Sequence, residues 1–284
     1  MDQSTLPDHH NQGEDLEKLE IHLLLEGIYL NYGYDYRDYA YPSIRRRVWH
    51  RIHAEKLTTI SSLLDKVLHD SSYFERLIAD FSINVTEMFR DPLFFKAFKE
   101  NVVPLLKTYP SIRIWHAGCS TGEEVYSMAI LLHEVGLYEK TKIYATDINT
   151  DVLKTAKNGC FSLEHMKKYT NNYIQAGGEQ AFSDYYKVTD AGVKFHSYLT
   201  ENVVFAQHNL VTDSSFNEFH VILCRNVLIY FNKALQNKVH QLFYNSLGKF
   251  GVLCLGNKES INYTAFNENY EDISSSQKIY KKIK

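Results

Sequence analysis

A chain of 284 residues, 44% of them apolar, is long enough for one large domain and a smaller one. Its net charge of −3 excludes little, although it is a weak argument against general nucleic-acid binding. The four cysteines are scattered without a CxxC pair, which favours free thiols in a reducing cytosol over a disulfide framework. No apolar run approaches the roughly 20 residues of a membrane span, the polar N-terminus is unlike a secretory signal, and no spacing typical of a metal site occurs.

The N-terminal part of the chain has a helical pattern. Residues 1–14 are polar and acidic, and we expect them to form a flexible tail. From residue 15 to 83, apolar residues recur at spacings of three and four, and strand-like alternation is absent. One early stripe consists of Leu16, Leu19, Leu23 and Leu30. This segment therefore predicts a small all-helical domain.

Within that segment, the run Ile44–His53 (IRRRVWHRIH) combines an apolar stripe with positive charge. At about 100° per residue, the stripe consists of Ile44, Val48 and Ile52. The opposite side is expected to carry Arg46, Arg47, His50 and His53, with Arg45 and Arg51 flanking the stripe. Taken alone, the pattern is typical of a solvated basic face, and a nucleic-acid site is a weaker alternative for a single short stripe.

The second part of the chain, residues 84–284, changes its period. A helix is expected to begin at Asp91–Pro92, and strand-like runs then alternate with helical ones. The expected strands are Ile112–Ala117, Lys142–Thr146, Val203–His208, Val221–Cys224 and Val252–Leu255. The expected helices lie near Glu123–Val135, Thr150–Lys157 and Lys233–Leu247. This alternation predicts an α/β fold with a mainly parallel, doubly wound sheet. We interpret the stretch 161–198, which interrupts it, as an insertion.

The most informative run is Arg113–Ile130 (RIWHAGCSTGEEVYSMAI), a buried strand followed by a tight loop and the start of a helix. Ala117 and Gly118 begin a loop of small residues that lets the backbone come close to a ligand. A phosphate would favour a bare helix N-terminus or a lysine, whereas this helix starts with Glu123 and Glu124. Two carboxylates favour a cationic or amine-bearing ligand that also carries a nucleoside, and S-adenosylmethionine fits that description.

Asp147 and Arg225 each end an expected strand, where ligands of open α/β sheets lie. An acid at the position of Asp147 can accept both ribose hydroxyls; the alternative is that it caps the helix that begins at Thr150. Arg225 either closes a salt bridge or lines the site. A dinucleotide oxidoreductase would show GxGxxG in the first turn, and the run AGCSTGEE does not contain it.

The chain resembles the CheR-type chemotaxis receptor glutamate methyltransferases from about Leu23 to the C-terminus. Four sequence blocks carry this resemblance, and they occur in the same order as in the family. Besides the glycine loop, the blocks are Asn84–Pro92 (NVTEMFRDP), Ala145–Ala156 (ATDINTDVLKTA) and Phe219–Phe231 (FHVILCRNVLIYF). The resemblance implies a seven-stranded, Rossmann-like methyltransferase sheet that ends with a strand near Lys278–Lys281, preceded by a helical substrate-docking domain. It also implies methyl transfer from S-adenosylmethionine to receptor glutamates, which yields glutamate methyl esters and S-adenosylhomocysteine.

The resemblance further assigns roles to single residues. It implies that Arg90 and Tyr230 belong to the catalytic centre, with the tyrosine facing the methyl group. Without the resemblance, we would interpret Arg90 as part of a salt bridge between the domains and Tyr230 as an aromatic residue of the core. The cofactor contacts that we expect are Asn84, Thr86, Arg90, Ala117, Gly118, Glu123, Glu124, Asp147, Asn209, Leu210, Arg225 and Asn226. Glu124 is preferred over Glu123 for the cofactor amino group, and Asn209, taken alone, would be a turn residue.

The expected partners follow from the same resemblance. Family members use the basic helix against glutamate-rich receptor helices, so Arg46, Arg47 and Arg51 are expected to dock an acidic helix of a chemoreceptor. We expect a cytoplasmic monomer that is recruited to receptor clusters, without membrane insertion, nucleic acid or metal. In some family members the corresponding insertion is a β-subdomain that binds a peptide from the receptor tail. The insertion of this chain matches that subdomain poorly, so the resemblance does not imply tail binding.

Two alternatives stay open at this point. A non-catalytic adaptor would keep the cofactor site for sensing, but the chain retains Arg90, Arg225, Asn226 and Tyr230 together. A small-molecule or nucleic-acid methyltransferase would not require the basic helical domain. Departures from the family pattern, such as Val125 after the acidic pair and His220 in the fourth strand, leave the expected catalytic contacts in place.

Overall fold

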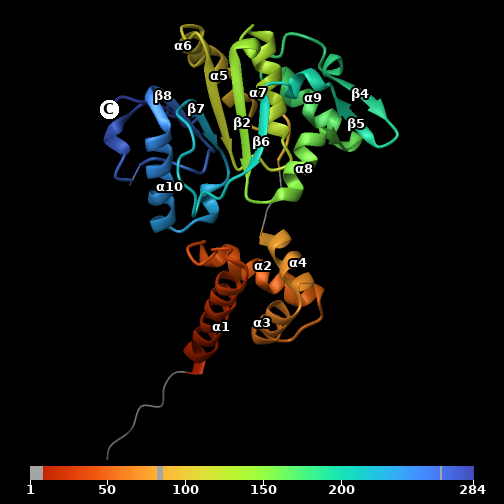
Figure 1. The fold of residues 1–284 in the computed structure, drawn as a ribbon, viewed down its shortest axis with the longest axis vertical. Coiled ribbons are helices and arrows are strands. Elements are labelled where there is room, and N and C mark those ends of the chain that lie inside the picture. Colours follow the sequence, from red (N-terminus) through yellow and green to blue (C-terminus); the bar gives the residue numbers. More distant parts are fainter. Residues whose placement is uncertain (1–8, 82–85, 263) are drawn as a thin grey trace, which may run out of the picture. The chain divides into compact units, whose positions relative to one another are not determined.

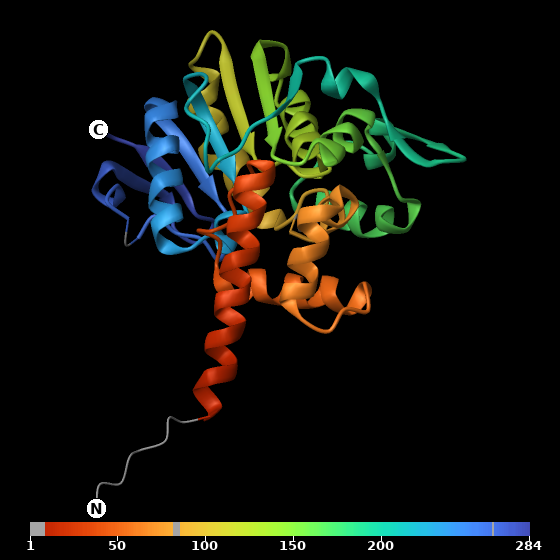
Figure 2. The ribbon, with the colours of Figure 1, turned by 60° about the horizontal axis from the view of Figure 1, so that its bottom comes forward.

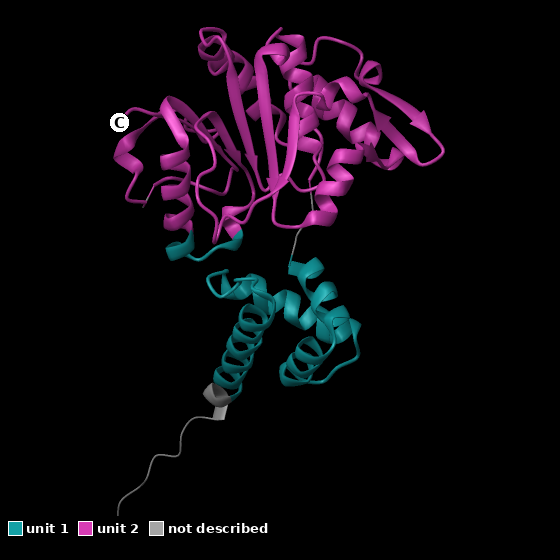
Figure 3. Cartoon of the chain, in the orientation of Figure 1, with its two compact units in different colours: residues 1–83, 230–235 teal, residues 84–229, 236–284 magenta. Residues whose placement is uncertain are grey.

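The computed structural model describes residues 9–81, 86–262 and 264–284. By its contacts the chain divides into two compact units, residues 1–83 with 230–235 and residues 84–229 with 236–284 (Figure 3). Within the described ranges, every helix is too short or too polar to cross a membrane. The same ranges contain no cluster of histidine, cysteine and acidic side chains that could hold a metal ion.

The first unit is all-helical, as the sequence predicts. Its helices are α1 (His9–Tyr32), α2 (Tyr41–Ala54), α3 (Ile60–His69) and α4 (Ser71–Phe81) (Figure 1). Helix α3 begins after Thr59, whose side chain accepts a hydrogen bond from the Ser62 amide and so caps the helix. The four helices enclose an apolar core that includes Leu24, Ile28, Val48, Leu63 and Leu77.

Helix α1 is longer than expected and carries two apolar faces. It begins at His9, so residues 9–14, expected to belong to a flexible tail, are helical; residues 1–8 lie outside the described ranges. Each residue added to a nucleated helix gains a hydrogen bond, which favours this extension. The core takes Ile21, Leu24, Leu25 and Ile28, whereas the stripe Leu16, Leu19, Leu23 and Leu30 is 47–79% exposed. The N-terminal part of α1 extends past the other helices of its unit (Figure 2).

The second unit is built on a seven-stranded sheet of order β6-β2-β1-β7-β8-β10-β9, which confirms the predicted methyltransferase-type sheet. The parallel strands are β6 (Val203–Gln207), β2 (Thr141–Asp147), β1 (Ile112–Ala117), β7 (Phe219–Cys224) and β8 (Leu247–Leu255). The antiparallel ones are β10 (Ile279–Lys282) and β9 (Tyr270–Ser274). Strand β9 was not predicted from the sequence. Because β1 is central, its end is flanked by the ends of β2 and β7.

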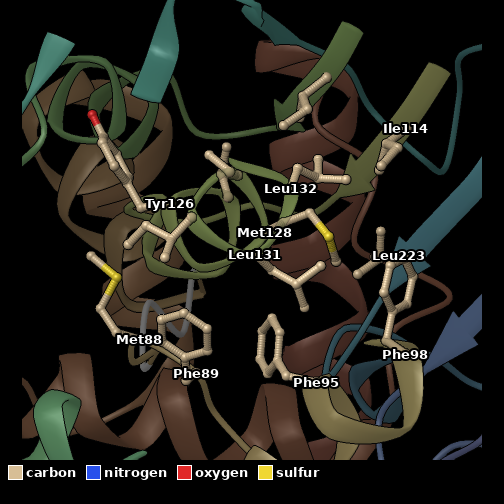
Figure 4. Close-up of a cluster of buried hydrophobic side chains, with 14 of the residues drawn as sticks. Met88, Phe89, Phe95, Phe98, Ile114, Tyr126, Met128, Leu131, Leu132 and Leu223 are labelled. Carbon is tan, nitrogen blue, oxygen red and sulfur yellow. The ribbon is translucent and has the colours of Figure 1, made fainter. Parts of the chain in front are cut away.

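Helices cover both faces of this sheet. They are α5 (Pro92–Asn101), α6 (Val103–Lys107), α7 (Glu123–Glu134), α8 (Thr150–Asn158), α9 (Met166–Gln175) and α10 (Lys233–Ser246). On one face, Ile114 of β1 belongs to a core that also contains Phe98 of α5 and Met128 of α7 (Figure 4). On the other, the adjacent Trp115 contacts Phe243 of α10. Consecutive strand residues point to opposite faces, so the sheet is doubly wound.

The stretch 161–198, interpreted from the sequence as an insertion, forms much of a small appendage beside the main sheet (Figure 1). It contains α9 and most of a three-stranded sheet of order β3-β5-β4. The strands are β3 (Cys160–Phe161), β5 (Gly192–Phe195) and β4 (Tyr186–Thr189), all paired antiparallel.

Candidate active site

The loop after β1 requires glycine at two positions for steric reasons. Gly118 has φ +79°, and a Cβ atom there would lie 2.6 Å from the Cγ2 atom of Val227. Gly122 has φ +95°, and a Cβ atom there would lie 2.8 Å from the Cβ atom of Ala156. The amides of Gly118 and Cys119 both donate to the carbonyl of Thr146, over 2.8 and 2.9 Å. The loop is thus fixed against the end of β2 and against the segment after β7.

Asp147 ends β2 and organises the same loop. Its carboxylate accepts hydrogen bonds from the amide of Ser120 at 2.9 Å and from the amide of Asn149 at 3.0 Å. Burial raises the pKa of Asp147, and these amides oppose that rise. The alternative that Asp147 caps α8 is wrong, because Asn149 is the N-cap and its side chain accepts from the amides of Asp151 and Val152.

The two acids at the start of α7 have different surroundings. Glu124 is bound by two groups: the Nδ1 atom of His116 lies 3.1 Å from Oε1, and Arg225 donates from Nη1 to Oε2 at 2.8 Å. Burial opposes ionisation of Glu124, but Arg225 and His116 outweigh it and lower its pKa to about 2. Glu123 accepts a hydrogen bond from the Thr121 hydroxyl at 2.6 Å, and burial raises its pKa.

Arg225 connects α7 to the segment that carries Arg90. Its side chain is 1% exposed and donates from Nη2 to Asp91 at 2.7 Å, as well as to Glu124. The guanidinium carbon lies 4.0 Å from the centre of the Phe94 ring. The sequence left open whether Arg225 closes a salt bridge or lines the site. The structure contains the salt bridge.

The backbone around Arg90 has an uncommon conformation. Phe89 and Asp91, on either side of it, have φ values of +50° and +56°, a left-handed geometry that is rare without glycine. The Phe89 amide donates to the Ser127 hydroxyl at 2.8 Å, and Arg225 donates to the Arg90 carbonyl at 3.4 Å. Such strain persists only where neighbouring contacts impose it. Thr86 and Arg90 are half-buried, and Asn84 lies outside the described residues.

Glu259 fixes the turn after β7, and no role was predicted for it from the sequence. It is 5% exposed, and its carboxylate accepts from the amides of Asn226, Val227, Leu228 and Gly256 at 2.6–2.9 Å. Burial raises its pKa, and the four amides oppose that rise. The available signal was an acid four residues after the apolar strand that ends at Leu255, where an unpaired buried carboxylate would be costly.

Asn209 and Leu210 follow β6, the neighbour of β2. The Asn209 side chain accepts from the Val211 amide at 2.9 Å, so it forms the turn that the sequence offered as an alternative. The His208 amide donates to the Asp147 carbonyl at 3.2 Å. This bond brings the turn beside the end of β2. The carboxyl ends of β1, β2, β6 and β7 thus gather most of the expected cofactor residues: Ala117, Gly118, Glu123, Glu124, Asp147, Asn209, Leu210, Arg225 and Asn226.

Tyr230 and the three arginines expected to dock a receptor belong to the helical unit. Tyr230 is grouped there, and Arg47 lies with its guanidinium carbon 4.8 Å from the centre of the tyrosine ring. Arg47 is 4% exposed and donates to the Phe81 carbonyl at 2.7 Å. The prediction that Arg47 lies on the exposed polar side of α2 is therefore wrong. At 100° per residue it lies only about a quarter-turn from the centre of the apolar stripe, close enough to be covered by α4.

Arg51 is likewise held within the helical unit. It donates to Asp80 at 2.7 Å, to Glu55 at 3.0 Å and to the Arg76 carbonyl at 3.0 Å. Arg46 is exposed. Of the three arginines expected to dock a receptor, Arg46 alone is classed as exposed within the described part of the chain.

The residues present suit S-adenosylmethionine. Ser120 Oγ and Arg225 Nε are buried and have no hydrogen-bond partner within the described ranges, so the site keeps polar groups for a ligand. Acids stand at the start of α7, after the loop that follows β1, and at the end of β2, where an amino group and ribose hydroxyls can be bound. Such a site on a seven-stranded sheet of this order defines the class of S-adenosylmethionine-dependent methyltransferases.

Comparison with known proteins identifies the family. Residues 84–279 match the model of the CheR methyltransferase, SAM binding domain, and residues 19–82 match that of the CheR methyltransferase, all-alpha domain. The chain belongs to the CheR methyltransferase family, and S-adenosylmethionine is its cofactor.

Several curated relatives span most of the chain. The Pseudomonas putida protein Cher3, named as a methyltransferase, is 50% identical over 93% of this chain and 97% of its own length. The chemotaxis protein methyltransferase of Listeria monocytogenes is 28% identical over 81% of this chain and 85% of its own length. The Escherichia coli protein of the same name is 28% identical over 83% and 82%.

Proposed function

We propose that the chain transfers a methyl group from S-adenosylmethionine to glutamate side chains of chemoreceptors, giving glutamate methyl esters and S-adenosylhomocysteine. The observation that carries this proposal is the chain of contacts Glu124–Arg225–Asp91, which ties the segment of Arg90 to the cofactor loop. It supports a role for Arg90 at the substrate carboxylate. The names of the Listeria and Escherichia relatives favour a chemotaxis protein as the acceptor.

The reaction requires alignment more than acid–base chemistry. A glutamate side chain, with a pKa near 4.3, is ionised at neutral pH and needs no general base. When bound, the cofactor supplies an electrophilic methyl group on a sulfonium. Positioning of the reacting groups can contribute on the order of 7–11 kcal/mol. In this proposal Arg90 orients the substrate carboxylate by a forked contact, without pairing so tightly that it blunts the nucleophile, and Tyr230 packs or hydrogen-bonds beside the methyl group.

The cofactor residues divide by the part of the molecule they bind. Asp147 holds the ribose hydroxyls, Asn209 and Leu210 border the adenine, and Arg225 with Asn226 borders the amino-acid end. Both oxygens of Glu124 have partners within the protein, so we now assign the cofactor amino group to Glu123 and give Glu124 the task of holding Arg225. Asn84 and Thr86 remain proposed cofactor contacts.

Receptor docking is proposed on the exposed side of α2. The exposed Arg46 gives this side positive charge, which is complementary to an acidic receptor helix. We no longer propose that Arg47 and Arg51 contact the receptor, because their guanidinium groups are bound within the helical unit. The proposed setting is the cytoplasm beside receptor clusters, with the enzyme as a monomer.

The test is transfer of labelled methyl from S-adenosylmethionine to a purified cytoplasmic fragment of a chemoreceptor from the same organism. The proposal predicts label in the fragment that is released by mild base, as expected for a methyl ester. Label that resists base would contradict glutamate methylation. Tight cofactor binding without any transfer to receptor fragments would favour the non-catalytic adaptor.

A further inference from the structure

We propose that Arg47 is a positioning residue that holds Tyr230 for methyl transfer. The inference rests on the proposed catalytic role of Tyr230. It gives Arg47, expected from the sequence to dock a receptor, a different task within the same reaction.

The segment Tyr230–Leu235 is fastened to the helical unit by its backbone. The amide of Ala40 donates to the Tyr230 carbonyl at 2.8 Å, and the amide of Asn232 donates to the Asp38 carbonyl at 2.9 Å. The Asn232 side chain also donates to the Asp38 carboxylate at 3.0 Å. These bonds place the main chain of Tyr230 but leave the direction of its side chain undetermined.

Arg47 supplies the contact that directs the ring. Its guanidinium lies over the face of Tyr230, with 4.8 Å between the guanidinium carbon and the ring centre. The Nη1 atom donates to the Phe81 carbonyl at 2.7 Å, which fixes the guanidinium at the end of α4. Burial lowers the pKa of Arg47, and its Nε and Nη2 atoms have no hydrogen-bond partner within the described ranges. A desolvated cation with few hydrogen bonds gains most from an aromatic face.

The motif that runs from Arg225 to Tyr230 is therefore fixed at two points. Glu259 binds the amides of residues 226–228, and Arg47 holds the ring of residue 230. Arg46, beside Arg47 on α2, is exposed and is proposed to contact the receptor. Neighbouring arginines on one helix thus have separable effects: Arg46 acts on receptor binding, and Arg47 acts on the rate of the bound complex.

The first experiment compares Arg47→Met with Arg76→Met. Arg76 also lies over a tyrosine of the helical unit, 4.4 Å from the ring centre of Tyr73, and is the matched control. Arg47→Met is expected to lower kcat by about 10- to 100-fold, as a misplaced catalytic group does, with little change in the receptor KM or the cofactor Kd. Arg76→Met is expected to keep kcat near that of the wild type. A raised receptor KM with normal kcat in Arg47→Met would overturn the proposal.

A double-mutant cycle with Tyr230→Leu then separates positioning from general structural damage. If Arg47 acts through Tyr230, Arg47→Met lowers kcat in the wild type but not in the Tyr230→Leu background. Equal losses in both backgrounds would overturn the positioning role. A Tyr230→Leu enzyme with wild-type kcat would instead contradict the proposed function of Tyr230, so the two failures are distinguishable. Should Arg47→Met not fold, as judged by its thermal midpoint, Arg47→Gln, which also removes the cation from the ring face, replaces it in the same cycle with the same expected and contradicting results.

Discussion

Two carboxylates, the half-buried Glu124 and the buried Glu259, fix the loops at the ends of β1 and β7, and each is stabilised in a different way. Glu124 is balanced by the positive charge of Arg225 and by His116. Glu259 is balanced by four backbone amides. These amides stabilise the carboxylate by hydrogen bonds alone, without a positively charged partner. Because all four bonds go to the backbone, the role of Glu259 is to fix the turn.

Replacing Glu259 by glutamine tests that role. The amide side chain turns an N–H group toward backbone donors, which leaves buried groups unpaired at a cost of about 1–3 kcal/mol each. We expect Glu259→Gln to lower the thermal midpoint and to weaken cofactor binding, measured by calorimetry. Glu218→Gln, at a side chain that is 70% exposed, is the control. Unchanged cofactor affinity in Glu259→Gln would show that the turn does not depend on this carboxylate.

Glu124 gives a prediction for pH dependence. Its pKa is lowered from an ordinary value of 4.5 to about 2 in the folded chain. A lowered pKa contributes stability that is present above the unfolded-state value and is lost as pH falls through the folded-state value. The free energy of unfolding should therefore fall between pH 4.5 and pH 2.

Glu124→Gln should remove this part of the acid sensitivity. It should also destabilise the protein at neutral pH, by about 3–5 kcal/mol if the buried Arg225 loses its main partner. Denaturant titrations of both proteins at neutral and acid pH measure the difference. Parallel losses of stability between pH 4.5 and pH 2 in wild type and variant would contradict the assignment.

At the scale of elements, the glycine loop between β1 and α7 owes its shape to close approach. Gly118→Ala combines a positive φ with a Cβ atom 2.6 Å from Val227. Gly136→Ala at φ +70° has nothing within 4 Å of the added Cβ atom, so it isolates the backbone strain. That strain alone costs roughly 1–2 kcal/mol. We expect Gly118→Ala to lose clearly more stability than Gly136→Ala and to bind the cofactor more weakly, and similar effects of the two changes would refute the steric argument.

The sequence predicts the central elements well because their apolar runs are long and regular. Strand β1 is predicted at its observed bounds, and β2 and α7 within a residue at each end. Strand β9, Tyr270–Ser274, was not predicted because Tyr270 is its one buried residue, so its sequence lacks the alternation of apolar and polar residues. Edge strands with exposed faces give little signal.

Single side chains were harder to place than elements. The glycine loop and Asp147 follow from local pattern, because a strand end and a tight turn are short-range features. The surroundings of Arg47, Arg51 and Glu259 depend on partners 25 to 34 residues away in sequence. A helical wheel gives the direction of an arginine, but whether another helix covers it depends on the tertiary fold.

At the scale of the whole molecule, the chain consists of a helical unit proposed to bind receptor and an α/β unit that binds cofactor. Residues 230–235 belong by their contacts to the helical unit although they follow β7 in the chain. The proposed catalytic motif therefore crosses from one unit to the other along the backbone. A division at residue 83 alone, as expected from the sequence, does not describe this.

The division of tasks predicts a selective effect of charge reversal at Arg46. Arg46→Glu should raise the KM for a receptor fragment about tenfold or more through loss of electrostatic complementarity, while the cofactor Kd stays the same. Lys66→Glu, at an exposed lysine of α3, changes the net charge equally and is the control. Equal effects of the two variants on KM would mean that overall charge, and not the exposed side of α2, governs docking.

The central claim is that the ends of β1, β2 and β7 hold the methyl donor with its amino-acid end toward Arg225. The most direct measurement is a crystal structure of the full chain with S-adenosylhomocysteine. We expect the ribose hydroxyls to lie on Asp147 and the amino group to lie beside Glu123. A nucleoside bound elsewhere, or Asp147 engaged only by the backbone amides that it binds in this structure, would contradict it.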